Sequence, residues 1–140
     1  MNSASSPLSL AQLARFGVVG LLATAVHAGV YMATVKPLLL TPLPANFAGF
    51  GCAFLLSFLG HRHWTFAAQA AGTSTVRSLP RFLATSLLGL GSNTFLTWLL
   101  TEYFKLPAES ALLGILFVTP LLTFICSKYW AFAPEARLGS

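Results

Sequence analysis

The sequence predicts an all-α membrane protein with four transmembrane helices, built from two parallel two-helix repeats, with both termini in the cytoplasm. Three observations predict it: a shortage of charge, four long apolar runs, and an internal repeat with an offset of 66 residues. Only 8% of the 140 residues are charged and 56% are hydrophobic, whereas a soluble domain carries about 25% charged residues. The composition therefore excludes an ordinary soluble enzyme and a disordered tail.

Charged residues divide the chain into apolar runs, each close to the ~20 residues that cross the hydrocarbon core of a bilayer. The runs predict helices at about residues 16–35, 45–61, 82–101 and 110–127. The second is the shortest, because Pro37, Pro42 and Pro44 precede it and proline belongs at or before the first turn of a helix. We expect residues 1–140 to form a single transmembrane domain.

The basic residues predict the orientation, since short loops rich in Lys and Arg stay in the cytoplasm. Two of the eight basic residues, Lys36 and Lys105, fall in the loops that follow the first and third helices. The other six lie near the termini or in the central loop: Arg15, Arg62, Arg77, Arg81, Lys128 and Arg137. This asymmetry predicts that both termini and the central loop are cytoplasmic.

Displacing the sequence by 66 positions aligns its two halves without a gap. The most specific matches are Arg15-Phe16 with Arg81-Phe82, Trp64 with Trp130, and Phe66-Ala67 with Phe132-Ala133. They predict repeat 1 at about 14–67, a flexible linker at 68–79 and repeat 2 at about 80–133. Each repeat would cross the membrane twice and return to its starting side, so the two would be parallel, as in some transporters.

Four short motifs stand at the ends of the predicted helices. Arg-Phe-Gly-Val-Val-Gly opens the first at 15–20, and Arg-Phe opens the third at 81–82. Ser-Phe-Leu-Gly-His-Arg-His-Trp-Thr-Phe closes the second at 57–66, and Thr-Phe-Ile-Cys-Ser-Lys-Tyr-Trp-Ala-Phe closes the fourth at 123–132. Together they resemble the GtrA-like family of small four-helix membrane proteins, over about residues 14–133. His61 is a departure, because the family usually has Asn at that position.

The resemblance implies a role in transferring sugars from polyprenyl-phosphate carriers, of the undecaprenyl type, to cell-surface polysaccharides such as lipopolysaccharide O-antigen. It implies a flippase of the bacterial plasma (inner) membrane that moves the lipid-linked monosaccharide from the cytoplasmic to the outer leaflet. The alternative is a non-transporting accessory protein that anchors or positions a glycosyltransferase. The partners expected are this lipid, membrane lipids, a glycosyltransferase and a second copy of the chain.

Enzymatic chemistry has little support in the sequence. Glu102 and Glu109 fall in a loop and Glu135 in the C-terminal segment, so no carboxylate lies inside a predicted helix. The three histidines form no metal-ligand pattern, and we expect no catalytic residue, metal or cofactor. Nucleic-acid binding has only the net charge of +5 in its favour, and the topology already accounts for that charge.

A phosphate-linked lipid needs a cationic docking site. Arg15 and Arg81 begin the first and third helices, where free backbone N–H groups and the helix dipole favour an anion. Arg62 and Lys128 follow the second and fourth. The candidate phosphate-binding residues are Arg15, Arg62, Arg81, Lys128, His61 and His63. The alternative is that these cations only set the topology and meet anionic lipid head groups.

Sugar hydroxyls crossing hydrocarbon need polar partners as well, because each unsatisfied group costs several kcal/mol there. His27 lies near the middle of the first predicted helix, and the 66-residue offset places Asn93 at the matching point of the third. The candidate polar path consists of His27, Asn93, Thr24, Ser92 and Thr97. The alternative is a structural hydrogen bond between His27 and Asn93.

Other residues suggest packing rather than chemistry. Pro120, inside the fourth predicted helix, is expected to kink it. Trp64 and Trp130 are interpreted as anchors at the membrane interface. Small residues recur at every fourth position of the second helix, which favours close helix packing or self-association. They are Ala45, Gly49, Ala53 and Ser57.

Overall fold

The computed structural model describes residues 9–35, 41–107, 109–110 and 114–135. Every regular element within these ranges is helical. Residues 7–67 form one compact unit, and residues 68–140 make up most of a second one. Lys36 and Arg137, two of the cations used to predict the orientation, lie outside the described residues.

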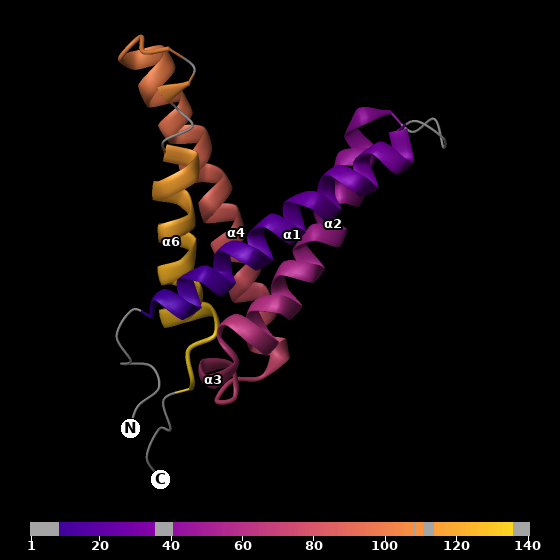
Figure 1. The fold of residues 1–140 in the computed structure, drawn as a ribbon, viewed down its shortest axis with the longest axis vertical. Helices are drawn as coiled ribbons and strands as arrows, with labels where there is room; N and C mark the ends of the chain where they lie inside the picture. The colour runs from indigo at the N-terminus through magenta and orange to yellow at the C-terminus, as the bar shows by residue number, and fades with distance from the viewer. Residues whose placement is uncertain (1–8, 36–40, 108, 111–113, 136–140) are drawn as a thin grey trace. The chain divides into compact units, whose positions relative to one another are not determined.

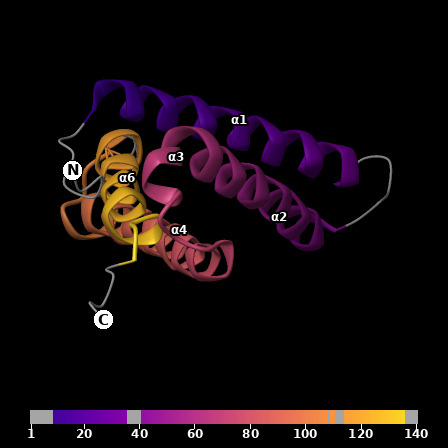
Figure 2. The same cartoon turned by 90° about the horizontal axis from the view of Figure 1, so that it is seen from below.

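The first unit is a helical hairpin. Helix α1 (Leu10–Val35) lies beside α2 (Pro42–Gly60), which continues into the π-helical turn η2 (His61–Thr65) (Figures 1 and 2). Helix α1 begins at Leu10 rather than at the predicted residue 16. The Ser9 hydroxyl accepts the backbone N–H of Gln12 at 3.4 Å, which caps the additional turns. Helical hydrogen bonding therefore extends beyond the charge-free run.

Helix α2 also begins earlier than predicted, at Pro42 instead of residue 45. Pro42 and Pro44 both fall in its first turn, where a backbone N–H has no intrahelical partner and its absence costs little. Thr41 precedes the helix with extended dihedral angles (φ −65°, ψ 156°). Together α2 and η2 give a continuous apolar stretch, Leu43–Thr65, of 23 residues.

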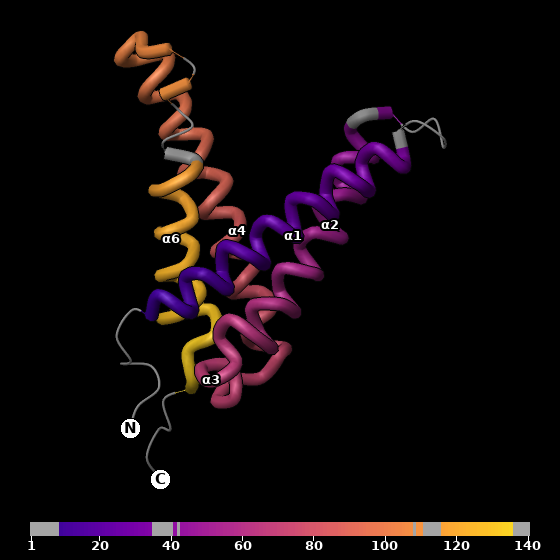
Figure 3. The backbone as a smooth tube through the Cα atoms, viewed as in Figure 1, coloured from indigo at the N-terminus to yellow at the C-terminus, as the bar shows by residue number. Residues whose placement is uncertain are grey.

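The second unit contains α4 (Thr75–Trp98), which continues into the π-helical turn η3 (Leu99–Tyr103). The chain returns through η4 (Gly114–Val118), α6 (Thr119–Cys126) and η5 (Ser127–Ala131). Helices α4 and α6 lie side by side in the ribbon and in the backbone tube (Figures 1 and 3). Pro120 is the second residue of α6 and directly follows the π-helical turn η4, so it lies inside the apolar helix Leu116–Ala131, as predicted for the fourth helix.

The segment predicted as a flexible linker contains regular structure. The short helix α3 (Ala67–Ala70) is followed by a turn, and α4 begins at Thr75 instead of residue 82. At the turn, a Cβ built on Gly72 would lie 2.5 Å from Pro134 Cβ. The backbone N–H of Glu135 donates to the Gly72 oxygen at 3.1 Å. Glycine therefore allows the segment after η5 to pack directly on this turn.

Among the described residues, three helical stretches are long and apolar enough to cross a membrane: Leu10–Thr34, Leu43–Thr65 and Thr75–Tyr103. A shorter apolar helix covers Leu116–Ala131. The predicted fourth span also includes residues 111–113, which lie outside the described residues. Between 11% and 17% of an apolar 18-residue segment within each long stretch is buried, so the rest of that segment is available for contact with lipid. By these helices the chain is a multi-pass membrane protein.

Close packing in the first unit depends on small residues of α2. A Cβ on Gly49 would lie 2.7 Å from His27 Cδ2, and one on Gly60 would lie 2.9 Å from Val19 Cγ1. Ala45 is completely buried. Part of the predicted small-residue stripe is therefore used within the hairpin, where it lets α1 approach α2 closely.

We expect Gly49→Ala to lower the free energy of unfolding by about 1–3 kcal/mol, because its Cβ would overlap the His27 ring and lie 2.9 Å from the His27 backbone oxygen. Equilibrium unfolding of the full chain in bicelles, followed by circular dichroism, measures this change. Gly51→Ala is the matched control, since its Cβ meets nothing within 4 Å and alanine is the better helix former. Equal destabilisation by both variants would contradict the packing explanation.

Candidate functional site

An arginine–tryptophan pair closes one end of the first unit. Arg15 projects from α1 toward η2, and its Nη1 donates to the Trp64 backbone oxygen at 3.5 Å. Its guanidinium carbon lies 5.7 Å from the centroid of the Trp64 ring, in a cation–π contact. Gln12 Nε2 donates to the Thr65 oxygen at 3.3 Å. Side chains of α1 therefore satisfy carbonyl groups that the helix end leaves without an intrahelical partner.

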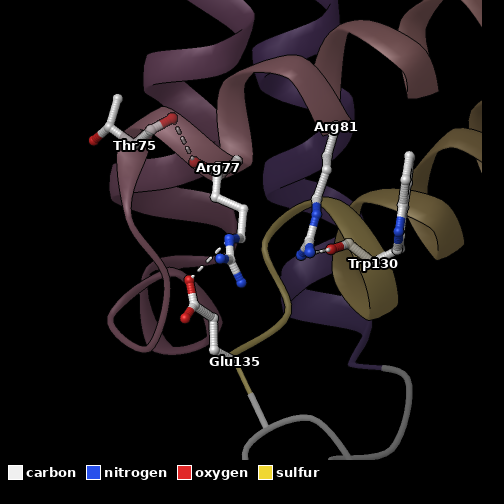
Figure 4. A network of polar contacts seen from close by, with 6 residues as sticks. Thr75, Arg77, Arg81, Trp130 and Glu135 are labelled. Carbon is white, nitrogen blue, oxygen red and sulfur yellow. Dashed lines mark hydrogen bonds and ion pairs between the residues drawn. The ribbon is translucent and has the colours of Figure 1, made fainter.

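The second unit contains the same arrangement 66 residues later. Arg81 of α4 donates from Nη1 to the Trp130 backbone oxygen at 3.4 Å, as Figure 4 shows. Its guanidinium carbon lies 6.0 Å from the centroid of the Trp130 ring. The turns η2 and η5 that carry the two tryptophans have the same length and the same offset in the sequence. We call these two contacts the Arg–Trp pairs.

The two π-helical turns also end in the same way. The backbone N–H of Phe66 donates to the His61 oxygen at 2.7 Å, and that of Phe132 donates to the Ser127 oxygen at 2.9 Å. Both phenylalanines are completely buried. Phe82 packs against Phe132 with ring centroids 5.5 Å apart. A buried aromatic residue therefore ends each turn and fixes the position of the tryptophan before it.

His61 belongs to the core of the first unit. Its side chain is only 3% exposed, stacks on Phe16 at a centroid distance of 4.5 Å, and places Nδ1 3.0 Å from Thr65 Oγ1. Ser127 occupies the equivalent position in η5 and is also buried. Its hydroxyl has no hydrogen-bond partner among the residues that the structure describes. The two turns therefore share a backbone but differ in the side chains that fill them.

The remaining candidate cations differ in exposure. Arg62 is half-buried and His63 is exposed, both in η2. Lys128 in η5 is completely buried, with Nζ 5.5 Å from the centroid of the Tyr129 ring. Arg77, which the sequence analysis used for the orientation and not as a site residue, forms an ion pair with Glu135 (Nε–Oε1 3.2 Å) on the segment that follows η5 (Figure 4).

His27 and Asn46 form a polar contact between α1 and α2. His27 Nε2 lies 3.0 Å from Asn46 Oδ1, within hydrogen-bonding distance. The sequence analysis did not identify Asn46, although it is the only amide side chain in the second predicted helix. Thr24 Oγ1 instead donates to the Gly20 oxygen of its own helix at 2.9 Å.

Asn93 takes part in the corresponding contact of the second unit. Its Oδ1 accepts the Thr119 hydroxyl of α6 at 2.5 Å, and a Cβ on nearby Gly89 would lie 2.7 Å from Thr123 Cγ2. Ser92 and Thr97 are half-buried on α4. His27 and Asn93 therefore each have a partner inside their own unit.

Metal binding requires a cluster of suitable side chains. Within the described ranges, no three His, Cys, Asp or Glu residues lie together as metal ligands would. The polar groups that do lie together are guanidinium, amide, imidazole and hydroxyl groups. These groups suit hydrogen bonding to phosphate oxygens and sugar hydroxyls.

A family model for the GtrA/DPMS transmembrane domain matches residues 15–132. The chain belongs to this family. The matched region begins at Arg15 of the first Arg–Trp pair and ends at Phe132, which closes η5. GtrA proteins are linked to the glycosylation of cell-surface polysaccharides, and membership implies a lipid-linked sugar context. Neither the curated proteins nor the solved structures contain a significant match to the chain.

We expect a measurable coupling between His27 and Asn46 in a double-mutant cycle of the full chain in bicelles. Interhelical hydrogen bonds in membranes contribute about 0.6 kcal/mol on average, so His27→Leu and Asn46→Leu should couple by about that amount. Thr34→Val replaces Asn46→Leu in the control cycle, because the hydrogen bonds that Thr34 forms with described residues go to carbonyls of its own helix, at 2.8 and 3.1 Å. A coupling near zero for His27 and Asn46 would contradict the assignment.

Proposed function

We propose that this protein translocates a polyprenyl-phosphate-linked monosaccharide from the cytoplasmic to the outer leaflet of the bacterial plasma membrane. The sugar would then be used to glycosylate a cell-surface polysaccharide. The observation that supports this function most directly is the recurrence of an Arg–Trp pair at the end of both units, in a chain of the GtrA/DPMS family. An undecaprenyl carrier and a cytoplasmic location of both termini belong to the proposal.

We further infer that the two units are parallel repeats derived from one hairpin. Three features separated by 66 residues support this: the π-helical turns η2 and η5, the Arg–Trp pairs, and the hydrogen bonds that end at Phe66 and Phe132. In parallel repeats, equivalent ends of the two hairpins face the same side of the membrane. Arg15 and Arg81 would then both meet the cytoplasmic leaflet, where the substrate is made.

In this proposal the phosphate docks on the guanidinium groups. Arginine presents several N–H donors in a plane and binds phosphate oxygens through two parallel hydrogen bonds. Arg15 on α1 and Arg81 on α4 supply the principal contacts, and Arg62 and His63 add donors from η2. Lys128 is completely buried in η5, so we assign it a contribution of charge and not a direct contact with the phosphate. His61 stacks on Phe16 of α1, so we assign it the role of holding η2 in place against α1 and not of binding the phosphate.

The sugar hydroxyls need a polar path after docking. His27 with Asn46, and Asn93 with Thr119, hold donors and acceptors inside the spans, where hydrocarbon offers none. Each pair can exchange its internal hydrogen bond for bonds to a passing hydroxyl, and Thr24, Ser92 and Thr97 stand close to them in sequence. The prenyl chain stays in lipid, and consumption of the sugar outside draws the exchange forward.

Leaflet exchange in proteoliposomes tests the function directly. An impermeant reagent reports how fast a polyprenyl-phosphate monosaccharide reaches the accessible leaflet. We expect wild-type protein to exceed empty liposomes, and Arg15→Gln or Arg81→Gln to slow exchange by about tenfold, because hydrogen bonds to charged groups contribute roughly 1.5–3 kcal/mol. Both variants must keep the helical circular-dichroism spectrum of the wild type.

Lys105→Gln is the matched control for loss of one positive charge. Lys105, in the loop after η3, is exposed and pairs with Glu102 of η3 at 3.5 Å, so exchange should not change. If folded wild-type protein gave no exchange with several sugars, the translocase proposal would fail. The accessory role, in which the protein anchors or positions a glycosyltransferase, would then be the better explanation.

A further inference from the structure

Trp64 and Trp130 each make two contacts with one arginine. The face of the indole ring lies under the guanidinium group at 5.7 and 6.0 Å. The backbone oxygen of the same residue accepts Nη1 at 3.5 and 3.4 Å. One residue therefore restrains both the location of the guanidinium group and the direction in which one of its edges points.

We propose that Trp64 and Trp130 are positioning residues for anion binding, each holding an arginine with its unused edge turned to a phosphate group. The inference rests on the proposed function, because it assigns how the docking arginines of that function are held. A free arginine side chain loses much rotamer entropy when it binds a ligand. An arginine already restrained on a ring has lost part of that entropy before binding, and therefore binds more tightly.

The restrained guanidinium groups keep enough donors for a ligand. A guanidinium group has five N–H donors, and in the described residues one hydrogen bond from each of Arg15 and Arg81 is used, by the tryptophan oxygen. Trp64 is 45% exposed and Trp130 is 48% exposed. Arg15 is exposed and Arg81 half-buried, so at either pair a lipid phosphate can reach the guanidinium group and bind through two donors.

Comparison of the two turns supports a specific role for the tryptophans. Residues 61–65 read His-Arg-His-Trp-Thr and residues 127–131 read Ser-Lys-Tyr-Trp-Ala, so tryptophan is the one residue that the two turns share. An anchoring role at the membrane interface needs only an aromatic ring at the correct depth. Anchoring at the interface therefore does not explain why an arginine from another helix lies over the tryptophan ring in both units.

Trp98 is an exposed tryptophan whose ring contacts among the described residues are with aromatic rings and not with a guanidinium group. It stands near the end of α4 and is 51% exposed, like the other two. Its ring contacts in the structure are Phe95 and Tyr103, each at a centroid distance of 6.2 Å. Trp98→Leu is therefore a matched control that removes an exposed indole ring but leaves both arginines in place.

Binding of farnesyl phosphate to the full-length protein in zwitterionic nanodiscs tests the inference, with farnesol as the uncharged control. We expect Trp130→Leu and Trp64→Leu to raise the Kd for farnesyl phosphate by about three- to tenfold, the usual range for losing a cation–π contact. Trp130→Phe keeps a ring face and should raise it less. Trp98→Leu should leave the Kd unchanged, and circular dichroism confirms that each variant is folded.

A second background separates positioning from a general structural role. In protein that carries Arg81→Gln, the additional change Trp130→Leu should have no further effect on the Kd, because the ring has no guanidinium group to hold. An equal loss in both backgrounds would overturn the inference, and so would a Trp130→Leu protein that binds as tightly as wild type while Arg81→Gln weakens binding. If neither Arg15→Gln nor Arg81→Gln weakened binding of farnesyl phosphate, the arginines would not be the docking site. The proposed docking site and this inference would then both be wrong.

Discussion

Polar groups inside a membrane span must find their partners within the protein, because hydrocarbon supplies no hydrogen bonds. In this chain several such groups find their partner through short-range contacts inside one unit. The hydroxyls of Thr24, Thr34 and Thr94 donate to carbonyls of their own helices. His27 and Asn93 bond across to the neighbouring helix. The register between the paired helices therefore follows from polar contacts together with the close approaches at Gly49, Gly60 and Gly89.

The contacts at the ends of the two units meet the same requirement for hydrogen-bond partners. The π-helical turns leave carbonyl groups at the ends of the two units, and side chains of the opposite helix donate to them. Arginine is suited to this position, because it can satisfy a carbonyl group with one donor and still offer others. The same side chain can thus make a structural contact and, in the proposed function, bind an anion. The proposed function draws on this double use of Arg15 and Arg81.

Composition and charge-free runs predicted the helical, membrane-spanning character of the chain, and its motifs predicted the family. The helix ends were predicted less well. An apolar run marks the part of a helix that lies in hydrocarbon, whereas hydrogen bonding continues through polar residues, so α1 reaches Leu10 and α4 begins at Thr75. The polar partners of His27 and Asn93 depend on how two helices face one another. Spacing along the chain therefore did not identify Asn46 or Thr119, and the role of each candidate site residue stays a prediction.

The Arg–Trp pairs also limit how the helices of one unit can move. Arg15 and Trp64 lie on opposite helices of a hairpin, so their contact exists in a single alignment of α1 against α2. Sliding α1 by one helical turn would displace Arg15 by about 5.4 Å, which would carry the guanidinium group away from the ring. Val19 against Gly60 resists the same displacement sterically. The hairpin, rather than the single helix, is therefore the smallest part of this protein that can shift as a rigid body.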